Sequence, residues 1–472
     1  MNLNKLTSAM AIASFATLAT FSTQTISAPI YADFPVTVKD YQGDKKTSVS
    51  YGGQIARHVL HNSLKKLAGQ GNGAANPELL AKMQSYFANK DANRAILDPV
   101  SKEGFTVSET DVDQLSKAKN LAGKAYKGAV NGWPGNMTAA EVLAFMVEKA
   151  SAADAGFDFN NGMDYPQLIS KFTMGAVFYN QAVDSYLDEK LAGDVKPNDQ
   201  PYKKGAPYTG KEHVWDEAFG YFGTPANTLD LDAATAHAIA KGKKEALTAA
   251  DRNANGKIDL ATEMTYAHAY YAASTDKGGK TNYLQTITKA FIDGRQLITD
   301  AKGEKLSDAQ RSQLLGHADI IKTNWELVIA EATFKYAGSV YSDALKLQAG
   351  IEKNQDVKAL FKKYIHHWGE LKGFSMSLQT SGKDLGGVAV SLNRLIGYSP
   401  VLLGNTQVTG IDAKGNYQQS SSVDLNEFAL QMLKVQQLLA DNFALKARAK
   451  DQLANLSALA AKLGSGKNTE ND

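Results

Sequence analysis

The chain contains no cysteine in its 472 residues. A protein without cysteine has no disulfide framework, no thiolate nucleophile, no thiolate metal ligand and no cysteine-linked lipid anchor. Any metal site must therefore use histidine, carboxylate, tyrosine, amide or backbone oxygen ligands. These ligands suit iron, zinc, manganese or calcium.

Net charge is also nearly absent, because 51 basic and 49 acidic side chains leave a formal charge of +2. Such a balance does not indicate a strongly positive surface that would bind nucleic acid or an anionic membrane, and we expect no nucleic-acid partner. Prolines are few and lie mainly in connections such as 197–207. Sequence patterns that alternate as strands do are nearly absent as well.

Long apolar runs are missing after the N-terminus. Lys5 is followed by an uncharged stretch from Leu6 to Ala28, and its length and basic flank predict a secretory signal peptide over residues 1–28 rather than a membrane span. Ala28 and Ala32 are both candidate cleavage points, which places the mature start between residues 29 and 33. We expect an exported, periplasmic protein without a transmembrane segment.

Helical periodicity dominates from Tyr51 to about Leu456, with apolar residues spaced three and four apart. This pattern predicts an all-α protein of antiparallel helices. We expect two pseudo-repeated helical-bundle halves, residues 33–300 and 301–460. The polar, glycine-rich end, residues 464–472, is predicted to be a disordered tail.

The two halves are suggested by a short motif that occurs twice, at residues 213–221 and 366–374. Both windows read His-x-Trp-x-Glu-x-x-Gly-aromatic, and together they hold two of the four tryptophans and three of the eight histidines. Two such rare residue types recurring in register indicate duplication. On a helix, residues four apart share a face, so each histidine can offer a nitrogen to the same point as its glutamate.

One interpretation is a metal or ligand site assembled from both copies, with iron or zinc as the metal. Asp216 adds another polar group to the first copy and His367 another to the second. The alternative is structural, with the tryptophans as packing residues and each histidine bonded to its neighbouring carboxylate. The candidate ligands are His213, Asp216, Glu217, His366, His367 and Glu370.

A second motif, at residues 251–263, matches the start of an EF-hand calcium loop. Oxygen-bearing side chains occupy positions one, three, five and nine, with glycine at position six. Its glutamate comes one residue late, at position thirteen, and the flanking segments 233–250 and 260–273 both read as helix. A bare turn is the alternative, since Asp, Asn and Gly favour turns. The candidate calcium residues are Asp251, Asn253, Asn255, Lys257, Asp259 and Glu263.

The residues 213–223, His-Val-Trp-Asp-Glu-Ala-Phe-Gly-Tyr-Phe-Gly, together with 251–260 resemble the bacterial domain family of unknown function numbered 4856, which looks related to the imelysins. The likeness is expected to extend from about Tyr51 to Leu456. The resemblance implies an exported all-helical protein with two similar bundle halves, often linked to iron uptake and at times proposed as a metallopeptidase. His367 and Glu370 match the end of the imelysin signature Gly-x-His-x-x-Glu, whereas Ile365 replaces its glycine.

Three functions follow from these observations. The first is a non-enzymatic, exported, imelysin-like binding protein that holds a metal ion or a metal-containing ligand between its halves and serves iron or other metal uptake, with a membrane transport partner. The second is a metallopeptidase of the imelysin type using His367 and Glu370. The third is a structural or interaction protein with only a structural calcium loop.

Overall fold

The computed structural model describes residues 29–102 and 104–467. The predicted signal peptide and residues 468–472 of the predicted tail lie outside this part of the chain. The last described helix, α15 (Leu456–Lys467), extends into the segment that was predicted to be disordered from residue 464 onward. Within the described residues no helix is both long and apolar enough to cross a membrane.

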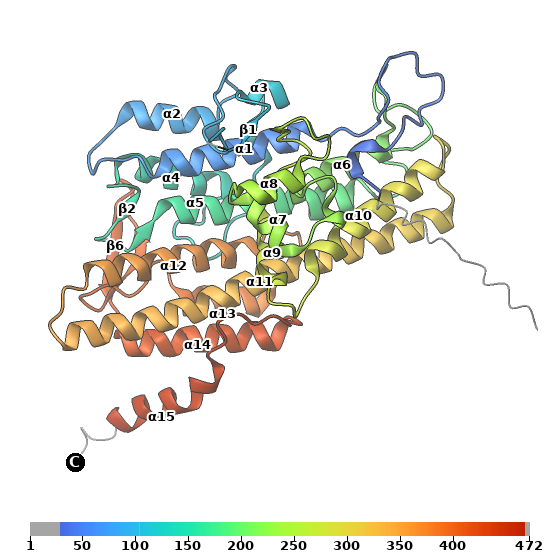
Figure 1. Cartoon of the computed structure of the whole chain (residues 1–472). Helices are drawn as coiled ribbons and strands as arrows, with labels where there is room; N and C mark the ends of the chain where they lie inside the picture. The colour runs from blue at the N-terminus through green and yellow to red at the C-terminus, as the bar shows by residue number, and fades with distance from the viewer. Residues whose placement is uncertain (1–28, 103, 468–472) are drawn as a thin grey trace, which may run out of the picture.

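The prediction of an all-α fold is confirmed, because helices dominate and strands are short (Figure 1). The remaining α-helices are α1 (Gly52–Ala68), α2 (Pro77–Phe87), α3 (Val112–Leu115), α4 (Ala139–Ala152), α5 (Tyr165–Thr173), α6 (Gly210–Phe222), α7 (Ala233–Ala240), α8 (Lys244–Ala250), α9 (Ala267–Asp276), α10 (Tyr283–Asp300), α11 (Asp308–Glu352), α12 (Lys358–Ser377), α13 (Gly386–Ile396) and α14 (Leu425–Asn442). A π-helix, η3 (Met174–Glu189), continues directly from α5.

The strands form three small pairs: β1 (Thr106–Val107) with β4 (Lys257–Ile258) in parallel, and β2 (Phe157–Asp158) with β3 (Met163–Asp164) and β5 (Thr406–Ile411) with β6 (Tyr417–Ser421) antiparallel. The β5–β6 hairpin was not predicted. Short 3-10 turns complete the elements: η1 (Tyr31–Asp33), η2 (Ala122–Lys124), η4 (Thr228–Asp230) and η5 (Leu453–Asn455).

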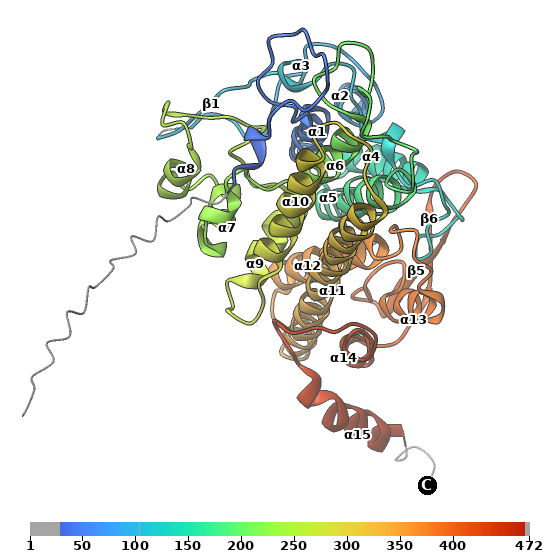
Figure 2. The same cartoon turned by 90° about the vertical axis from the view of Figure 1, so that its right-hand side faces the viewer.

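The long helix α11 is the centre of the molecule. It runs the length of the body and packs against α9, α10, α12 and α14 (Figures 1 and 2). A capping box starts it, since the Ser307 hydroxyl accepts from the Gln310 N–H while the Gln310 side chain accepts from the Ser307 N–H. Its Trp325 is fully buried. α11 therefore joins the two predicted halves in one packed core.

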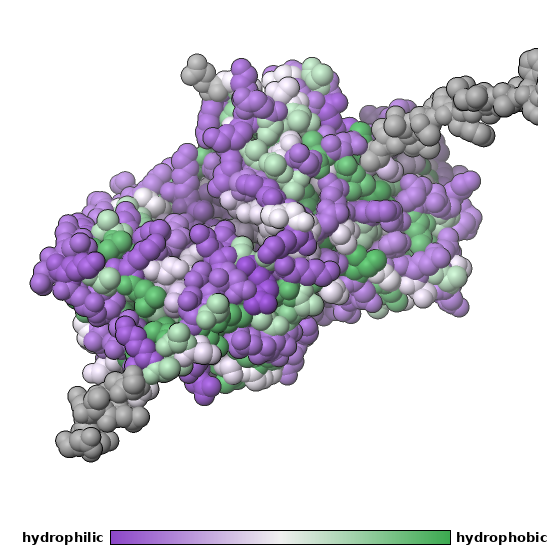
Figure 3. All heavy atoms as spheres, turned by 60° about the horizontal axis from the view of Figure 1, so that its bottom comes forward, coloured by the Kyte–Doolittle hydropathy of each residue, from purple (hydrophilic) through white to green (hydrophobic). Residues whose placement is uncertain are grey.

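The predicted division near residue 300 stays a prediction. α12, in the second predicted half, packs on α5 in the first, and α10 packs on α11 across the boundary. α15 lies apart from the main body, beyond α14. On the face seen in Figure 3, hydrophilic residues cover most of the surface and apolar residues occur in small groups between them.

Candidate functional site

The two copies of the repeated motif lie on α6 and α12, and their common residues have the same packing roles. Trp215 and Trp368 are both fully buried, and each indole N–H donates to a backbone carbonyl, that of Phe291 at 2.8 Å and that of Ile396 at 3.1 Å. Their glycines allow close helix contact. A Cβ at Gly220 would lie 2.6 Å from Tyr51, the residue directly before α1, and one at Gly373 would lie 2.5 Å from Lys171 on α5.

The motif glutamates also meet equivalent neighbours. The Gln54 amide donates to Glu217 Oε1 at 2.8 Å, and Lys171 Nζ lies 3.6 Å from Glu370 Oε1. Gln54 approaches Gly220 just as Lys171 approaches Gly373. The repeated pattern thus encodes a local helix–helix packing unit in both places.

The structure keeps the two copies apart. α6 packs on η3, α1 and α10, whereas α12 packs mainly on α11 and α5, with η3 as a neighbour of both helices. Among the described residues, no ion pair, hydrogen bond or ring contact joins His213 or Glu217 to the second copy. The expected single site built from both halves is therefore not the arrangement that the fold produces.

In the first copy, His213 lies in an aromatic environment. Its ring stacks on Tyr208 with centroids 4.6 Å apart and tilts against Tyr202 at 4.3 Å. His213 Nε2 is 3.8 Å from Glu217 Oε2. Burial lowers the pKa of His213, which favours the neutral imidazole at neutral pH.

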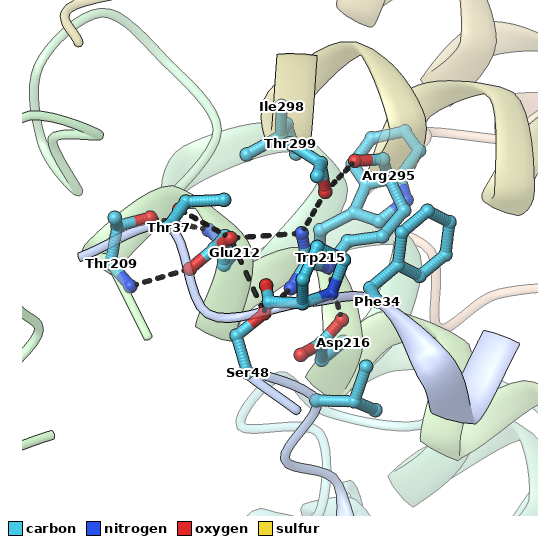
Figure 4. A network of polar contacts seen from close by, with 12 residues as sticks. Phe34, Thr37, Ser48, Thr209, Glu212, Trp215, Asp216, Arg295, Ile298 and Thr299 are labelled. Carbon is cyan, nitrogen blue, oxygen red and sulfur yellow. Dashed lines mark hydrogen bonds and ion pairs between the residues drawn. The ribbon is translucent and has the colours of Figure 1, made fainter. Parts of the chain in front are cut away.

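Asp216 does not join this pair, because it points toward Arg295 on α10. Its carboxylate accepts from Arg295 Nε at 3.0 Å (Figure 4) and from the Tyr31 hydroxyl at 3.0 Å. Arg295 also donates to Glu212 Oε1 at 3.0 Å, and the side chains of Arg295, Glu212 and Asp216 are completely buried. Burial raises the pKa of Asp216 to about 6, an effect that the Arg295 guanidinium opposes. Asp216 is thus part of a buried ion-pair network.

In the second copy, His366 is held by an aspartate that sequence reasoning missed. His366 Nδ1 lies 2.7 Å from Asp164 Oδ2, which is almost fully buried at the start of α5. This hydrogen bond is the main cause that raises the pKa of His366. It leaves Nε2 facing Glu370, whose Oε2 is 3.9 Å away.

His367 points elsewhere. Its Nδ1 lies 2.5 Å from Asp343 Oδ2 on α11. Adjacent residues on a helix project about 100° apart, which is why the two histidines bind carboxylates of different helices. Of the two histidines, only His366 is paired with Glu370.

Beside the second copy, residues of α1, α5, α9, α11 and α12 line a cavity of about 370 Å³ that is open to solvent on one side. We call it the α5–α12 cavity. Its polar lining includes His61, Asn62, Lys65, Asp98, Gln167, Ser170, Lys171, Lys241, Thr265, Tyr270, Tyr271, Tyr336, His366 and Glu370. The Lys171 ammonium, together with burial, lowers the pKa of Lys65 to about 7.

Two further histidines lie on α1. His58 and His61 are buried, with 0% and 2% of their surface exposed. His268, on α9, lies among Tyr179, Trp325 and Phe374. His61 reaches the α5–α12 cavity, whereas the other two belong to the core.

In the calcium-type loop, the side-chain oxygens accept hydrogen bonds from the backbone N–H groups of the loop itself. Asp251 accepts from the N–H groups of Asn255 and Gly256, and Asp259 accepts from those of Ala261 and Thr262. Asn253 and Asn255 accept from the N–H groups two residues on, at Asn255 and Lys257. Gly256 has a positive φ of 73°, as the sharp turn requires.

The helix expected from residue 260 begins only at Ala267, and the one expected over 233–250 is divided into α7 and α8 at residues 241–243. Glu263 therefore lies in a turn, where its carboxylate accepts from the N–H groups of Arg252 and Asp259 at 3.1 and 2.8 Å. The prediction of helix over 260–266 was wrong because this glutamate satisfies loop backbone instead of starting a helical turn.

Residues 38–339 match the family described as Domain of unknown function (DUF4856). The chain belongs to this family. The match includes the first copy of the motif and the calcium-type loop and ends within α11, before the second copy and short of the expected limit near Leu456. No curated protein and no solved structure matches the chain.

Proposed function

We propose that this DUF4856 protein is an exported, imelysin-like binding protein that holds a small metal-containing ligand in the α5–α12 cavity and serves iron or other metal uptake. The observation that supports it is the Asp164–His366 hydrogen bond of 2.7 Å. A metal-ligating histidine typically donates its second ring N–H to a carboxylate, which fixes the tautomer and turns the other nitrogen to the metal. A membrane transport partner would receive the ligand.

The protein supplies two donor atoms, His366 Nε2 and Glu370 Oε2, 3.9 Å apart. The described residues contain no group of three or more histidines and carboxylates placed to hold a metal ion. A protein site for bare zinc normally has three or four protein ligands. A ligand that brings its own donors to the metal fits the two-donor arrangement better than a bare iron or zinc ion.

The metallopeptidase alternative has less support. It relies on His367 with Glu370, and His367 is bonded to Asp343 rather than facing the cavity. A zinc peptidase also needs three ligands, an open position and a general base.

The structural alternative is favoured by one observation on the first copy. His213 packs between two tyrosines, and Asp216 pairs with Arg295. For that copy we propose a packing role, with no bound metal.

For the loop 251–263 we propose a structural calcium ion, held by the side chains of Asp251, Asn253, Asn255 and Asp259 and the carbonyl of Lys257. β4 ties this loop to β1, and Glu109 accepts from the Leu260 N–H at 2.9 Å. Calcium would then raise the melting temperature of the wild type and leave that of Asp251→Ala unchanged. Equal shifts, or none in either protein, would leave the loop as a bare turn.

Elemental analysis of the periplasmic protein, purified without chelator or affinity-tag metal, tests the metal proposal. His366→Gln should lose a stoichiometric transition metal, because its Nε2 donor is removed. His213→Gln is the matched control, since it changes the same motif position in the other copy and should keep the metal. A metal content that His366→Gln leaves unchanged, or wild-type protein that takes up no metal, would refute the proposal.

A further inference from the structure

The α5–α12 cavity holds more positive than negative groups. Lys171, whose side chain is only 4% exposed, has Glu370 at 3.6 Å, and the ammonium group of Lys65 lies near enough to be repelled by that of Lys171. Asp164 is bonded to His366, so Asp98 and Glu370 are the carboxylates left to balance the ammonium groups of Lys65, Lys171 and Lys241. Like charges held close together are costly unless an anion joins them.

Two side chains that line the same cavity have acceptor atoms without a hydrogen-bond donor. Gln167 Oε1 and His61 Nδ1 are buried without a hydrogen-bond partner in the described part of the chain, and both residues line the cavity. His61 Nε2 lies 3.0 Å from the Ser170 carbonyl oxygen, which can only accept, so Nε2 carries the hydrogen and Nδ1 is a lone-pair acceptor. Buried polar atoms in native proteins almost always have partners, so these two call for a donor from a bound molecule.

We propose that the α5–α12 cavity binds a small hydroxycarboxylate. A carboxylate of the ligand lies between Lys65 and Lys171, and its hydroxyl donates to Gln167 Oε1, with His61 Nδ1 as a second acceptor. The volume of about 370 Å³ is within the range of small-molecule sites. This inference deepens the proposed function, on whose cavity it rests, but it requires no metal.

An amino acid would also combine a carboxylate with a hydrogen-bond donor. Its ammonium group, however, would enter a cavity that already holds Lys65, Lys171, Lys241 and His366. A neutral hydroxyl avoids this repulsion. The charge of the cavity therefore selects a hydroxy acid.

Anion binding should also depend on pH through Lys65. A ligand carboxylate favours the charged ammonium, so affinity should rise as the pH falls through about 7, where Lys65 gains its proton. The charged and titratable groups that face Lys65 from the surrounding elements are His61, Asp98, Asp164, Lys171, Lys241, His366 and Glu370.

Calorimetric titration of chelator-washed, dialysed protein tests the inference with two probes, citrate and tricarballylate, which is citrate without its hydroxyl. We expect citrate to bind about tenfold more tightly, the effect of one well-placed hydrogen bond. Gln167→Leu should reduce citrate affinity to that of tricarballylate.

Lys65→Gln should weaken both probes at least about tenfold, as expected for the loss of a charged hydrogen bond. Lys66→Gln is the matched control, because Lys66 is the next residue on α1, is exposed and lies outside the cavity. Thermal melting of each variant verifies folding, and Lys65 is only partly buried.

Equal affinity for the two probes, unchanged binding in Lys65→Gln, or no binding of either probe would overturn the inference. The metal proposal fails separately. Citrate binding that survives in His366→Gln protein without metal would support the hydroxycarboxylate site even where elemental analysis finds no metal.

Discussion

Arg295 is a single side chain that fixes the first motif helix to α10 and to the N-terminal segment. It is fully buried and binds Glu212 and Asp216 on α6, the Ser48 hydroxyl and the Thr299 hydroxyl (Figure 4). Two carboxylates surround one guanidinium, so its removal would leave two uncompensated acids in the core.

We predict that Arg295→Met destabilises the protein by about 3–5 kcal/mol, the usual cost of breaking a buried ion pair on one side. Urea unfolding measures the change. Lys289→Met on the same helix is the control, because its pair with Asp293 is exposed and should contribute less than about 1 kcal/mol. Similar losses in both variants would contradict the assigned role of Arg295.

The candidate ligands were only partly predictable at this scale. The pairing of each histidine with the glutamate four residues on follows from helix geometry, and the structure has both pairs at 3.8 and 3.9 Å. The partners Asp164, Lys65 and Lys171 come from other helices. No spacing within one helix encodes them, since they depend on how α1, α5 and α12 pack.

Among the elements, the motif helices are positioned by their glycines. A Cβ at Gly220 would lie within 2.6 Å of Tyr51, and one at Gly373 within 2.5 Å of Lys171, so neither helix can keep its position with a larger residue.

We predict that Gly220→Ala and Gly373→Ala each lower the free energy of unfolding by about 1–3 kcal/mol through overpacking. Gly316→Ala is the control in α11, where a Cβ would meet nothing within 4 Å. It should stabilise the protein by about 0.5–1 kcal/mol, because alanine favours helix. Denaturant unfolding distinguishes the opposite signs, and a loss in Gly316→Ala would contradict this explanation.

Helical periodicity sufficed to predict most elements, since apolar spacing of three and four marks α4, α11 and α14 directly. It failed at the β5–β6 hairpin, where residues of β6 are largely exposed and no apolar alternation identifies the strand. It also failed after the calcium-type loop, because the bonds of Glu263 to loop N–H groups outweigh the helix preference of the following residues.

For the whole molecule, three buried histidines make the free energy of unfolding depend on pH. Burial lowers the pKa of His58, His61 and His268 to about 3. These histidines take up protons near pH 6.5 in the unfolded chain but only near pH 3 in the folded protein. Their contribution to the free energy of unfolding is therefore complete above pH 6.5 and is lost as the pH falls toward 3. His366 has the opposite sign, since its pKa is raised.

We predict a steep loss of stability between about pH 6.5 and 3, of up to about 1.4 kcal/mol per pH unit for each buried histidine. His268→Leu should reduce this slope by the contribution of one histidine, because it removes one titrating group. It breaks no hydrogen bond, since neither ring nitrogen of His268 has a partner among the described residues. Thermal melting across this pH range measures it. An unchanged slope in His268→Leu would contradict the assignment.

Tyr31 brings the start of the described chain into the core. It is fully buried, its ring stacks on Phe219 with centroids 3.6 Å apart, and its N–H donates to the Ala226 carbonyl at 3.0 Å. Cleavage after Ala32 would remove this residue, whereas cleavage after Ala28 keeps it. If the predicted signal peptide is cleaved, we predict a mature N-terminus at residue 29, which intact-mass measurement of protein expressed with residues 1–28 checks. A mature chain that begins at residue 33 would contradict the prediction.

If residues 1–28 are the leader that the sequence predicts, a precursor still held at that leader would have only Pro29 and Ile30 to span the distance from the export machinery to Tyr31 in the protein interior. Completion of the fold and release of the leader would then be competing events at one end of the chain. The Tyr31 contact would make maturation a step in folding, so that uncleaved protein is recognisable by its looser N-terminal region.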